Sequence, residues 1–167
     1  MMNRERVQIR PADEADVPVI LRFIRELAAY EKMEDQVIAT EALLREWVFQ
    51  KRKARVLLAE ENGVPCGFAL YFYNFSTFLG RAGIYLEDLY VTPAARGKGI
   101  GKLLLQNLAA IAVREGCGRL EWACLDWNHP SIGFYRALGA CPMDDWTTYR
   151  VTGETLRTLA GKTGENT

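Results

Sequence analysis

A glycine-rich segment between a hydrophobic strand and a helix constrains the fold of this chain more than any other stretch. Residues 84–91 have the sequence IYLEDLYV, which is typical of a buried strand. Residues 102–115 place Leu104, Leu108 and Ile111 on one face of an expected helix. Between these two elements, residues 96–101 have the sequence RGKGIG. The order is therefore strand, glycine loop, helix.

This order suits the binding of an anion. The first N–H groups of a helix have no partners within the helix, and the helix dipole adds about half a positive charge there. Glycine lets the backbone adopt positive φ and approach a ligand closely. Arg96, Lys98 and Lys102 add full charges. We therefore expect a phosphate or pyrophosphate site at this loop.

The glycine spacing excludes two familiar phosphate loops. A P-loop needs one more residue before its Gly-Lys pair than the segment from Gly97 to Gly101 provides, and Lys102 is followed by Leu103 instead of Ser or Thr. The dinucleotide pattern Gly-x-Gly-x-x-Gly fails because Lys102 stands at its last position. The remaining motif is Arg-x-x-Gly-x-Gly.

Length and charge narrow the class of protein. The chain has 167 residues, which suits one domain with a hydrophobic core. Lys plus Arg and Asp plus Glu both total 21, so the formal net charge is zero, which argues against a general nucleic-acid binder. The N-terminus shows no signal peptide, and no apolar run is long enough for a membrane span. We expect no nucleic-acid partner and no membrane partner.

The cysteines indicate a cytoplasmic protein without a metal. Cys66, Cys117, Cys124 and Cys141 form no CxxC pair, and His129 is the single histidine. Reduced thiols are the rule in the cytoplasm. We therefore expect a cytoplasmic location and no metal site.

Periodicity and turn residues predict the remaining elements. We expect strands at 7–10, 54–60, 64–73, 84–91, 119–125 and 146–151, and helices at 15–30, 41–49, 102–115 and 130–138. Residues 74–83 are expected to form a loop and residues 161–167 a frayed tail, so that the ordered core runs from about 6 to 160. The expected fold is one α+β domain over residues 1–167, with helices on both faces of a mixed central sheet.

The glycine loop in this setting resembles the acetyl-CoA loop of the GNAT superfamily of N-acetyltransferases. The order of elements also resembles the GNAT (acyl-CoA N-acyltransferase) fold, in which the central strand and the next one splay apart and acetyl-CoA enters the gap. The resemblance implies that the loop amides bind the pyrophosphate of CoA. The expected acetyl-CoA residues come from the end of the central strand, the glycine loop and the later segment 128–135. They are Leu89, Tyr90, Val91, Arg96, Gly97, Lys98, Gly99, Ile100, Gly101, Lys102, Asn128, Ser131 and Tyr135.

Tyr135 is the candidate general acid. A phenol with a pKa near 10 is protonated at neutral pH and can donate to a departing thiolate. GNAT enzymes commonly carry an Asn followed by a helix with Phe-Tyr, and here Asn128 precedes Phe134 and Tyr135. The alternative is an aromatic side chain packed in the core.

Glu87 and Asp88 lie inside the apolar central strand. A carboxylate there is costly unless it is paired or functional. Neighbouring strand residues face opposite sides, so only one of the two needs to face the cleft. We expect Glu87 to attract the amine or accept its proton through water, with a buried salt bridge as the alternative.

Three segments resemble the diamine acetyltransferase (spermidine/spermine N-acetyltransferase) family: residues 30–37, 85–88 and 126–128. This resemblance implies that Tyr30, Glu31 and Glu87 contact the amine and that the protein is a homodimer. Polyamine-acetylating members carry Asp-Pro-Trp where this chain has residues 76–78, Ser-Thr-Phe. That departure is more similar to the branch that prefers thialysine.

The sequence thus predicts an acetyl-CoA-dependent N-acetyltransferase that acts directly on a primary amine of a small molecule, such as a thialysine-like amino acid, a diamine or a polyamine. Two other readings remain open. One is a protein or peptide N-acetyltransferase, and the other is a non-catalytic acyl-CoA sensor.

Overall fold

A computed structural model of the chain describes residues 7–161. The chain divides after Ala123 into two units. The first contains β1 (Val7–Pro11), η1 (Glu14–Asp16), α1 (Val17–Tyr30), η2 (Glu34–Gln36), α2 (Glu41–Leu44), η3 (Arg45–Gln50), β2 (Arg55–Glu61), β3 (Val64–Ser76), β4 (Arg81–Val91), η4 (Pro93–Ala95), α3 (Ile100–Arg114) and β5 (Leu120–Trp122). The second contains α4 (His129–Ala137) and α5 (Gly153–Ala160).

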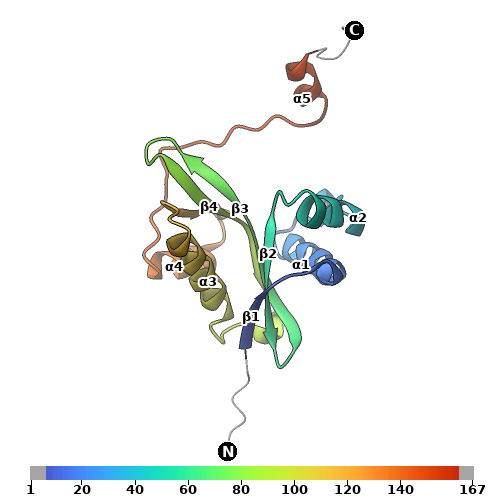
Figure 1. Cartoon of the computed structure of the whole chain (residues 1–167), viewed down its shortest axis with the longest axis vertical. Coiled ribbons are helices and arrows are strands. Elements are labelled where there is room, and N and C mark those ends of the chain that lie inside the picture. Colours follow the sequence, from blue (N-terminus) through green and yellow to red (C-terminus); the bar gives the residue numbers. More distant parts are fainter. Residues whose placement is uncertain (1–6, 162–167) are drawn as a thin grey trace, which may run out of the picture. The chain divides into compact units, whose positions relative to one another are not determined.

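The five strands form one sheet in the order β1-β2-β3-β4-β5. The first four strands are antiparallel, and β5 pairs with β4 in parallel. Within the first unit, α1 and α2 lie on one side of the sheet and α3 on the other (Figure 1). The expected mixed sheet with helices on both faces is confirmed.

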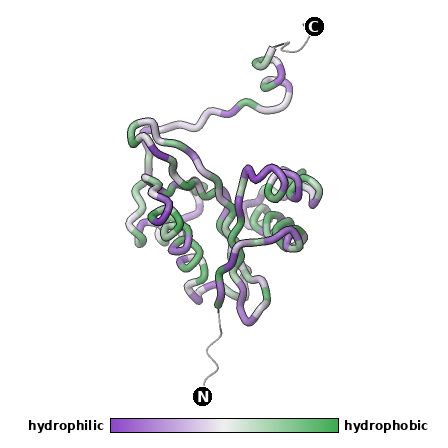
Figure 2. The backbone as a smooth tube through the Cα atoms, in the orientation of Figure 1, coloured by the Kyte–Doolittle hydropathy of each residue, from purple (hydrophilic) through white to green (hydrophobic). Residues whose placement is uncertain are grey.

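The face of the sheet toward α1 holds an aromatic core. Ile20 and Phe23 of α1 are buried with Val56, Leu58 and Phe68 of the sheet in one cluster. Val56 and Leu58 alternate along β2 with Leu57 and Ala59, which are also buried, so both faces of this strand are covered. Hydrophobic residues accordingly follow the strands between the helices (Figure 2). The burial of these side chains stabilises the packing of α1 on the sheet.

Tyr90 belongs to the same cluster and connects the core to the end of β4. Its ring centroid lies 5.6 Å from that of Phe23, which in turn lies 5.7 Å from that of Phe68. Tilted pairs at this separation are favourable geometry for aromatic rings. The core therefore fixes the position of Tyr90.

The other face packs against α3. Leu104 and Leu108 are fully buried, and α3 contacts β3 and β4. The helix begins at Ile100, two residues before the expected start, which brings Gly101 and Lys102 into its first turn.

Local signals place several boundaries correctly. Asp13 and Asp16 form a capping box ahead of α1, and Thr40 caps α2 by accepting a hydrogen bond from Leu43 N at 3.2 Å. Asn128 caps α4 by accepting from Ser131 N at 3.4 Å. These side chains satisfy N–H groups that the helix itself leaves unpaired.

Two expected elements differ from the structure between residues 74 and 125. The predicted loop at 74–83 is wrong, because β3 continues to Ser76 and β4 begins at Arg81, which leaves a short turn. Ser76 supports that turn, since its Oγ accepts a hydrogen bond from Leu79 N at 3.2 Å. The predicted strand at 119–125 is shorter, because only Leu120–Trp122 pair with β4.

The predicted strand at 146–151 is wrong. These residues follow no strand path and pair with no strand of the described chain. A strand needs a neighbour to accept and donate its backbone hydrogen bonds, and aromatic and β-branched composition alone cannot supply one. Helix α5 follows, although the sequence analysis did not expect it. The expected tail at 161–167 lies, apart from Gly161, outside the described residues.

Candidate active site

The central strand β4 has an irregular register at its acidic pair. Leu70 of β3 lies opposite Asp88, and Tyr71 lies opposite Leu86, so Glu87 is an extra residue in β4. Such a bulge bends the strand and interrupts the strict alternation of side chains. The expectation that Glu87 and Asp88 face opposite sides assumed a regular strand, and it stays a prediction at this bulge; Glu87 is exposed, whereas Asp88 is partly buried.

The pairing of β4 with β5 ends early. Only Ile84, Tyr85 and Leu86 of β4 pair with β5. Residues 87–91 therefore have no strand beside them on that side within residues 7–161. An exposed strand edge presents backbone N–H and C=O groups that can bind an extended ligand.

The glycine loop follows directly after this edge. Gly97 and Gly99 have φ values of 78° and 81°, which side chains with a Cβ rarely adopt. The first intrahelical hydrogen bond of α3 runs from Leu103 N to Gly99 O at 3.0 Å. The preceding N–H groups, at Ile100, Gly101 and Lys102, thus lie ahead of the helical ladder, as an anion site requires.

The cations of the loop point to different parts of the first unit. Lys98 Nζ lies 2.8 Å from Glu61 Oε1 in the β2–β3 hairpin. Arg96 Nε donates to the Val91 carbonyl at 3.0 Å. The Arg96 guanidinium lies 5.4 Å from the Tyr30 ring centroid and 5.8 Å from that of Tyr90.

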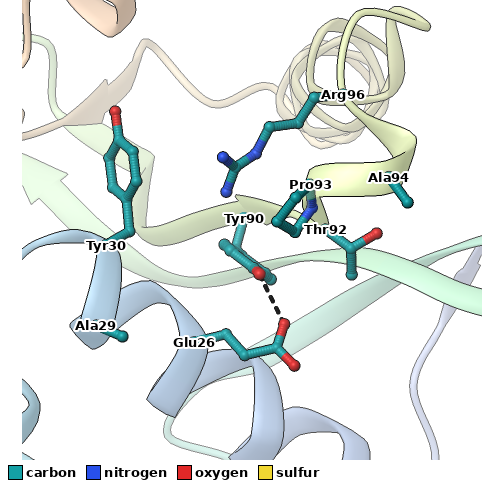
Figure 3. A pocket seen from close by; sticks show the side chains of 8 residues that line it. All are labelled: Glu26, Ala29, Tyr30, Tyr90, Thr92, Pro93, Ala94 and Arg96. Carbon is teal, nitrogen blue, oxygen red and sulfur yellow. Dashed lines mark hydrogen bonds between the residues drawn. The ribbon is translucent and has the colours of Figure 1, made fainter.

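A cleft of about 620 Å³ opens beside Arg96. Its walls come from α1, the end of β4 and η4, and its lining residues are Glu26, Ala29, Tyr30, Tyr90, Thr92, Pro93, Ala94 and Arg96 (Figure 3). The Tyr90 hydroxyl donates to Glu26 Oε2 at 2.6 Å. Burial and this bond raise the pKa of Tyr90 to about 12, so the phenol remains protonated at neutral pH.

The carboxyl group of Asp88 on β4 is affected by two other carboxyl groups. Burial, followed by the negative charges of Glu87 and Glu31, raises the pKa of Asp88 to about 7. Burial also raises the pKa of Glu31, the C-cap residue directly after α1. Glu31 and Glu87, which the family resemblance predicts as amine contacts, thus act electrostatically on Asp88, a residue without a predicted role. The sequence signal that could have indicated a role for Asp88 is the position of its carboxyl group inside an apolar strand, where the dielectric constant is low.

Tyr30 lies beside this group at the last position of α1. The three residues expected to contact the amine all belong to the first unit: Tyr30, Glu31 and Glu87. Carboxylates around an open strand edge can attract a cationic amine and accept its proton.

The other expected site residues belong to the second unit. Asn128 is the N-cap of α4, Ser131 donates its backbone N–H to that cap, and Tyr135 lies on the same helix. The Tyr135 ring centroid is 5.4 Å from that of Phe134. The roles of Asn128, Ser131 and Tyr135 toward acetyl-CoA stay predictions.

Within the described part of the chain, no three His, Cys, Asp or Glu side chains are grouped so that they could hold a metal ion. The four cysteines are not in disulfides. None of the helices among residues 7–161 has the length and apolar character needed to cross a membrane.

Comparison with known proteins agrees with this geometry. The model of the acetyltransferase (GNAT) family matches residues 21–140. The chain is similar to thialysine N-epsilon-acetyltransferase of Bos taurus, with 44% identity over 168 residues that cover 93% of this chain and 98% of the bovine protein. It is also similar to L-ornithine N5-acetyltransferase of Arabidopsis thaliana, with 30% identity over 198 residues that cover 91% of this chain and 87% of that protein.

A solved structure with the same fold is an integron cassette protein from the mobile metagenome of V. cholerae. It has a TM-score of 0.79 and 32% identity, and the alignment covers 93% of this chain and 98% of that protein. The chain belongs to the GNAT acetyltransferase family and is an N-acetyltransferase.

Proposed function

We propose that this enzyme transfers acetyl from acetyl-CoA directly to a primary amine of a small molecule. The observation that carries the proposal is the open edge of β4 at residues 87–91, which leads into the glycine loop at the start of α3. An extended pantetheine chain fits the edge, and a pyrophosphate fits the helix start. Glu87 and Asp88 lie on the same strand.

The amine must lose a proton before it can attack, because an alkyl ammonium has a pKa of about 10.4. Glu87 recruits the ammonium and accepts the proton through water, and the charge of Glu31 favours the cation nearby. The raised pKa of Asp88 supports a site in which a proton can be held near neutral pH.

In the transfer itself, the amine nitrogen attacks the thioester carbonyl. The C–N bond forms, the C–S bond breaks, and the products are the N-acetyl amine and CoA. Backbone N–H groups at residues 89–91 align the thioester and donate to the oxyanion. Tyr135 donates its phenolic proton to the departing thiolate.

The acceptor is best sought among small amino acids that carry a side-chain amine. The relatives named for thialysine and for L-ornithine act on such compounds, and both cover most of this chain. Ser76 stands where the polyamine-acetylating branch carries an acid, so diamines and polyamines are secondary candidates. Loss of an acid removes an attractive charge for a long polycation.

We also propose that the enzyme is a single domain that acts in the cytoplasm as a homodimer. The family match at residues 21–140 extends across both units, which supports a single acetyltransferase domain. The four cysteines outside disulfides support a cytoplasmic location. The exposed apolar side chains of residues 141–152, the C-terminal arm, support a homodimer.

A thiol-release assay tests the proposal. Acetyl-CoA is offered with thialysine, ornithine, lysine, putrescine, spermidine or a lysine peptide, and product masses are measured. We expect turnover with a small amino acid at a kcat/KM at least about tenfold above that with spermidine, a difference near 1.4 kcal/mol.

Other results would assign another function. Turnover with the peptide alone would indicate a protein N-acetyltransferase. Acetyl-CoA binding without turnover on any acceptor would indicate an acyl-CoA sensor and contradict the proposal.

A further inference from the structure

We propose that Arg96 is a positioning residue that ties the amine-binding end of α1 to the end of β4, and that it is not a ligand of the CoA pyrophosphate. The inference rests on the proposed function, because it assigns a role within the same site. It also departs from the sequence expectation, which counted Arg96 among the loop cations that bind phosphate.

The direction of the Arg96 side chain carries the inference. Its Nε donates to the Val91 carbonyl at 3.0 Å, so the side chain folds back onto the strand from which the loop emerges. The guanidinium points into the cleft, toward the rings of Tyr30 and Tyr90 (Figure 3). To reach a phosphate at the start of α3, it would have to leave these partners.

The two rings belong to different parts of the site. Tyr90 is held rigidly, because it is packed in the core and its hydroxyl is bonded to Glu26. Tyr30 is the last residue of α1 and precedes Glu31, whose carboxyl influences Asp88. A guanidinium between the rings therefore links a fixed strand end to the segment that carries the acceptor residues.

The end of α1 is a segment on which such a link can act. The N–H of Glu31 donates to Leu27 O at 2.9 Å, and the N–H groups of Lys32 and Met33 donate to Ala29 O and Ala28 O at 3.1 and 2.8 Å. Lys32 has a φ of 60°. Helix ends open locally more readily than helix middles, so these three bonds report how firmly the end of α1 is held.

The chemistry of arginine separates the two roles. Lysine keeps the positive charge but lacks the planar fork that stacks on rings and bonds a carbonyl at the same time. As a phosphate ligand, Arg96→Lys would retain much of the affinity for CoA. As a positioning residue, Arg96→Lys would lose the link while the pyrophosphate site at Gly97–Lys102 stays intact.

The first test is a kinetic split. We expect Arg96→Lys to raise the acceptor KM about tenfold and to leave the acetyl-CoA Kd, measured by calorimetry, within about twofold. The matched control is Arg55→Lys. The Arg55 guanidinium on β2 lies 5.4 Å from the ring centroid of Tyr73 on β3, and neither residue lines the cleft. The control is expected to change neither constant.

The second test is a double-mutant cycle with Tyr30. Tyr30→Leu alone is expected to raise the acceptor KM, and adding Arg96→Lys is expected to raise it by less than about twofold more, because both changes break the same contact. Fully multiplicative effects would mean that the two residues act independently and would overturn the link.

A third readout does not depend on catalysis. Hydrogen exchange at the amides of Glu31, Lys32 and Met33 is expected to be about fivefold faster in Arg96→Lys than in the wild type or Arg55→Lys. Faster exchange without turnover in any of the three proteins would contradict the proposed function and leave the link standing. Unchanged exchange, or a loss of acetyl-CoA affinity with an unchanged acceptor KM, would overturn the inference.

Discussion

Asp88 is the carboxyl group most affected by its surroundings. Its pKa of about 7 reflects burial first and then the charges of Glu87 and Glu31. The fold thus favours the neutral acid over the carboxylate. The group contributes its full stability below its ordinary pKa of 3.8, and this contribution is lost as the pH rises toward 7.

Asp88→Asn therefore has a pH-dependent effect on stability. Asparagine resembles the neutral acid, so at pH 8 the variant is expected to be more stable by about 1–3 kcal/mol, and at pH 4 the difference should vanish. Chemical unfolding at both pH values measures this. A gain of equal size at pH 4 and pH 8 would show that ionisation of Asp88 is not its cause.

Tyr135→Phe isolates the phenolic proton. The variant keeps the ring and its contact with Phe134 but cannot donate to sulfur. We expect kcat to fall by about 10²–10⁴-fold and the acetyl-CoA Kd to change far less. Rapid kinetics and calorimetry measure the two quantities. Equal turnover in wild type and variant would remove Tyr135 from the reaction.

At the scale of elements, the approach of β3 to β4 near the site is tight. Gly67 pairs with Val91, and a Cβ at Gly67 would lie 2.7 Å from the Tyr90 carbonyl oxygen. Real Cβ atoms do not approach so closely. Only glycine lets β3 hold the end of β4 in its present place.

Gly67→Ala is accordingly expected to displace residues 90–91. We predict a loss of about 1–3 kcal/mol in the free energy of unfolding, together with weaker acetyl-CoA binding. The control is Gly133→Ala in α4, where a Cβ meets nothing within 4 Å and the helix favours alanine over glycine. Full stability and affinity in Gly67→Ala would mean that the strands separate without cost.

Elements with local signals were predictable from the sequence. Asp13, Thr40 and Asn128 mark helix starts through bonds to nearby amides, and the glycine loop needs positive φ at Gly97 and Gly99. These features depend on residues a few positions away. The sequence therefore predicts the order β4, loop, α3 and the mixed sheet.

Features that depend on distant partners were not predictable. The bulge at Glu87 is defined by the register against β3, and the direction of Arg96 by the ring of Tyr30. The segment 146–151 has strand composition, but no strand of the described chain accepts its hydrogen bonds. The carboxyl group of Asp88 shifts because residues from α1 and β4 meet around it.

At the scale of the whole molecule, the C-terminal arm stands out. Trp146 is 75% exposed and Tyr149 is 92% exposed. Exposed patches of large apolar side chains mark interaction sites. A second copy of the chain is the partner that the proposed homodimer supplies.

We predict that Trp146→Ser with Tyr149→Ser shifts the protein from dimer to monomer in light scattering after gel filtration. Replacing one buried interface aromatic costs about 2 kcal/mol or more of binding free energy. The control is Phe78→Ser, a change of the same kind at a residue that is 96% exposed in the turn of the β3–β4 hairpin. A dimer that survives the double substitution would exclude the arm as its main contact.

The open edge of β4 also bears on how the protein survives before its ligand arrives. An unpaired strand edge invites extended segments of other chains to add to the sheet, which is a route to aggregation. Here the edge spans only residues 87–91 and begins with two acids, Glu87 and Asp88. Short length, a bulge and inward charges are the means by which sheet proteins repel such additions. The acidic pair proposed to serve the amine thus also disfavours the addition of another chain at this edge.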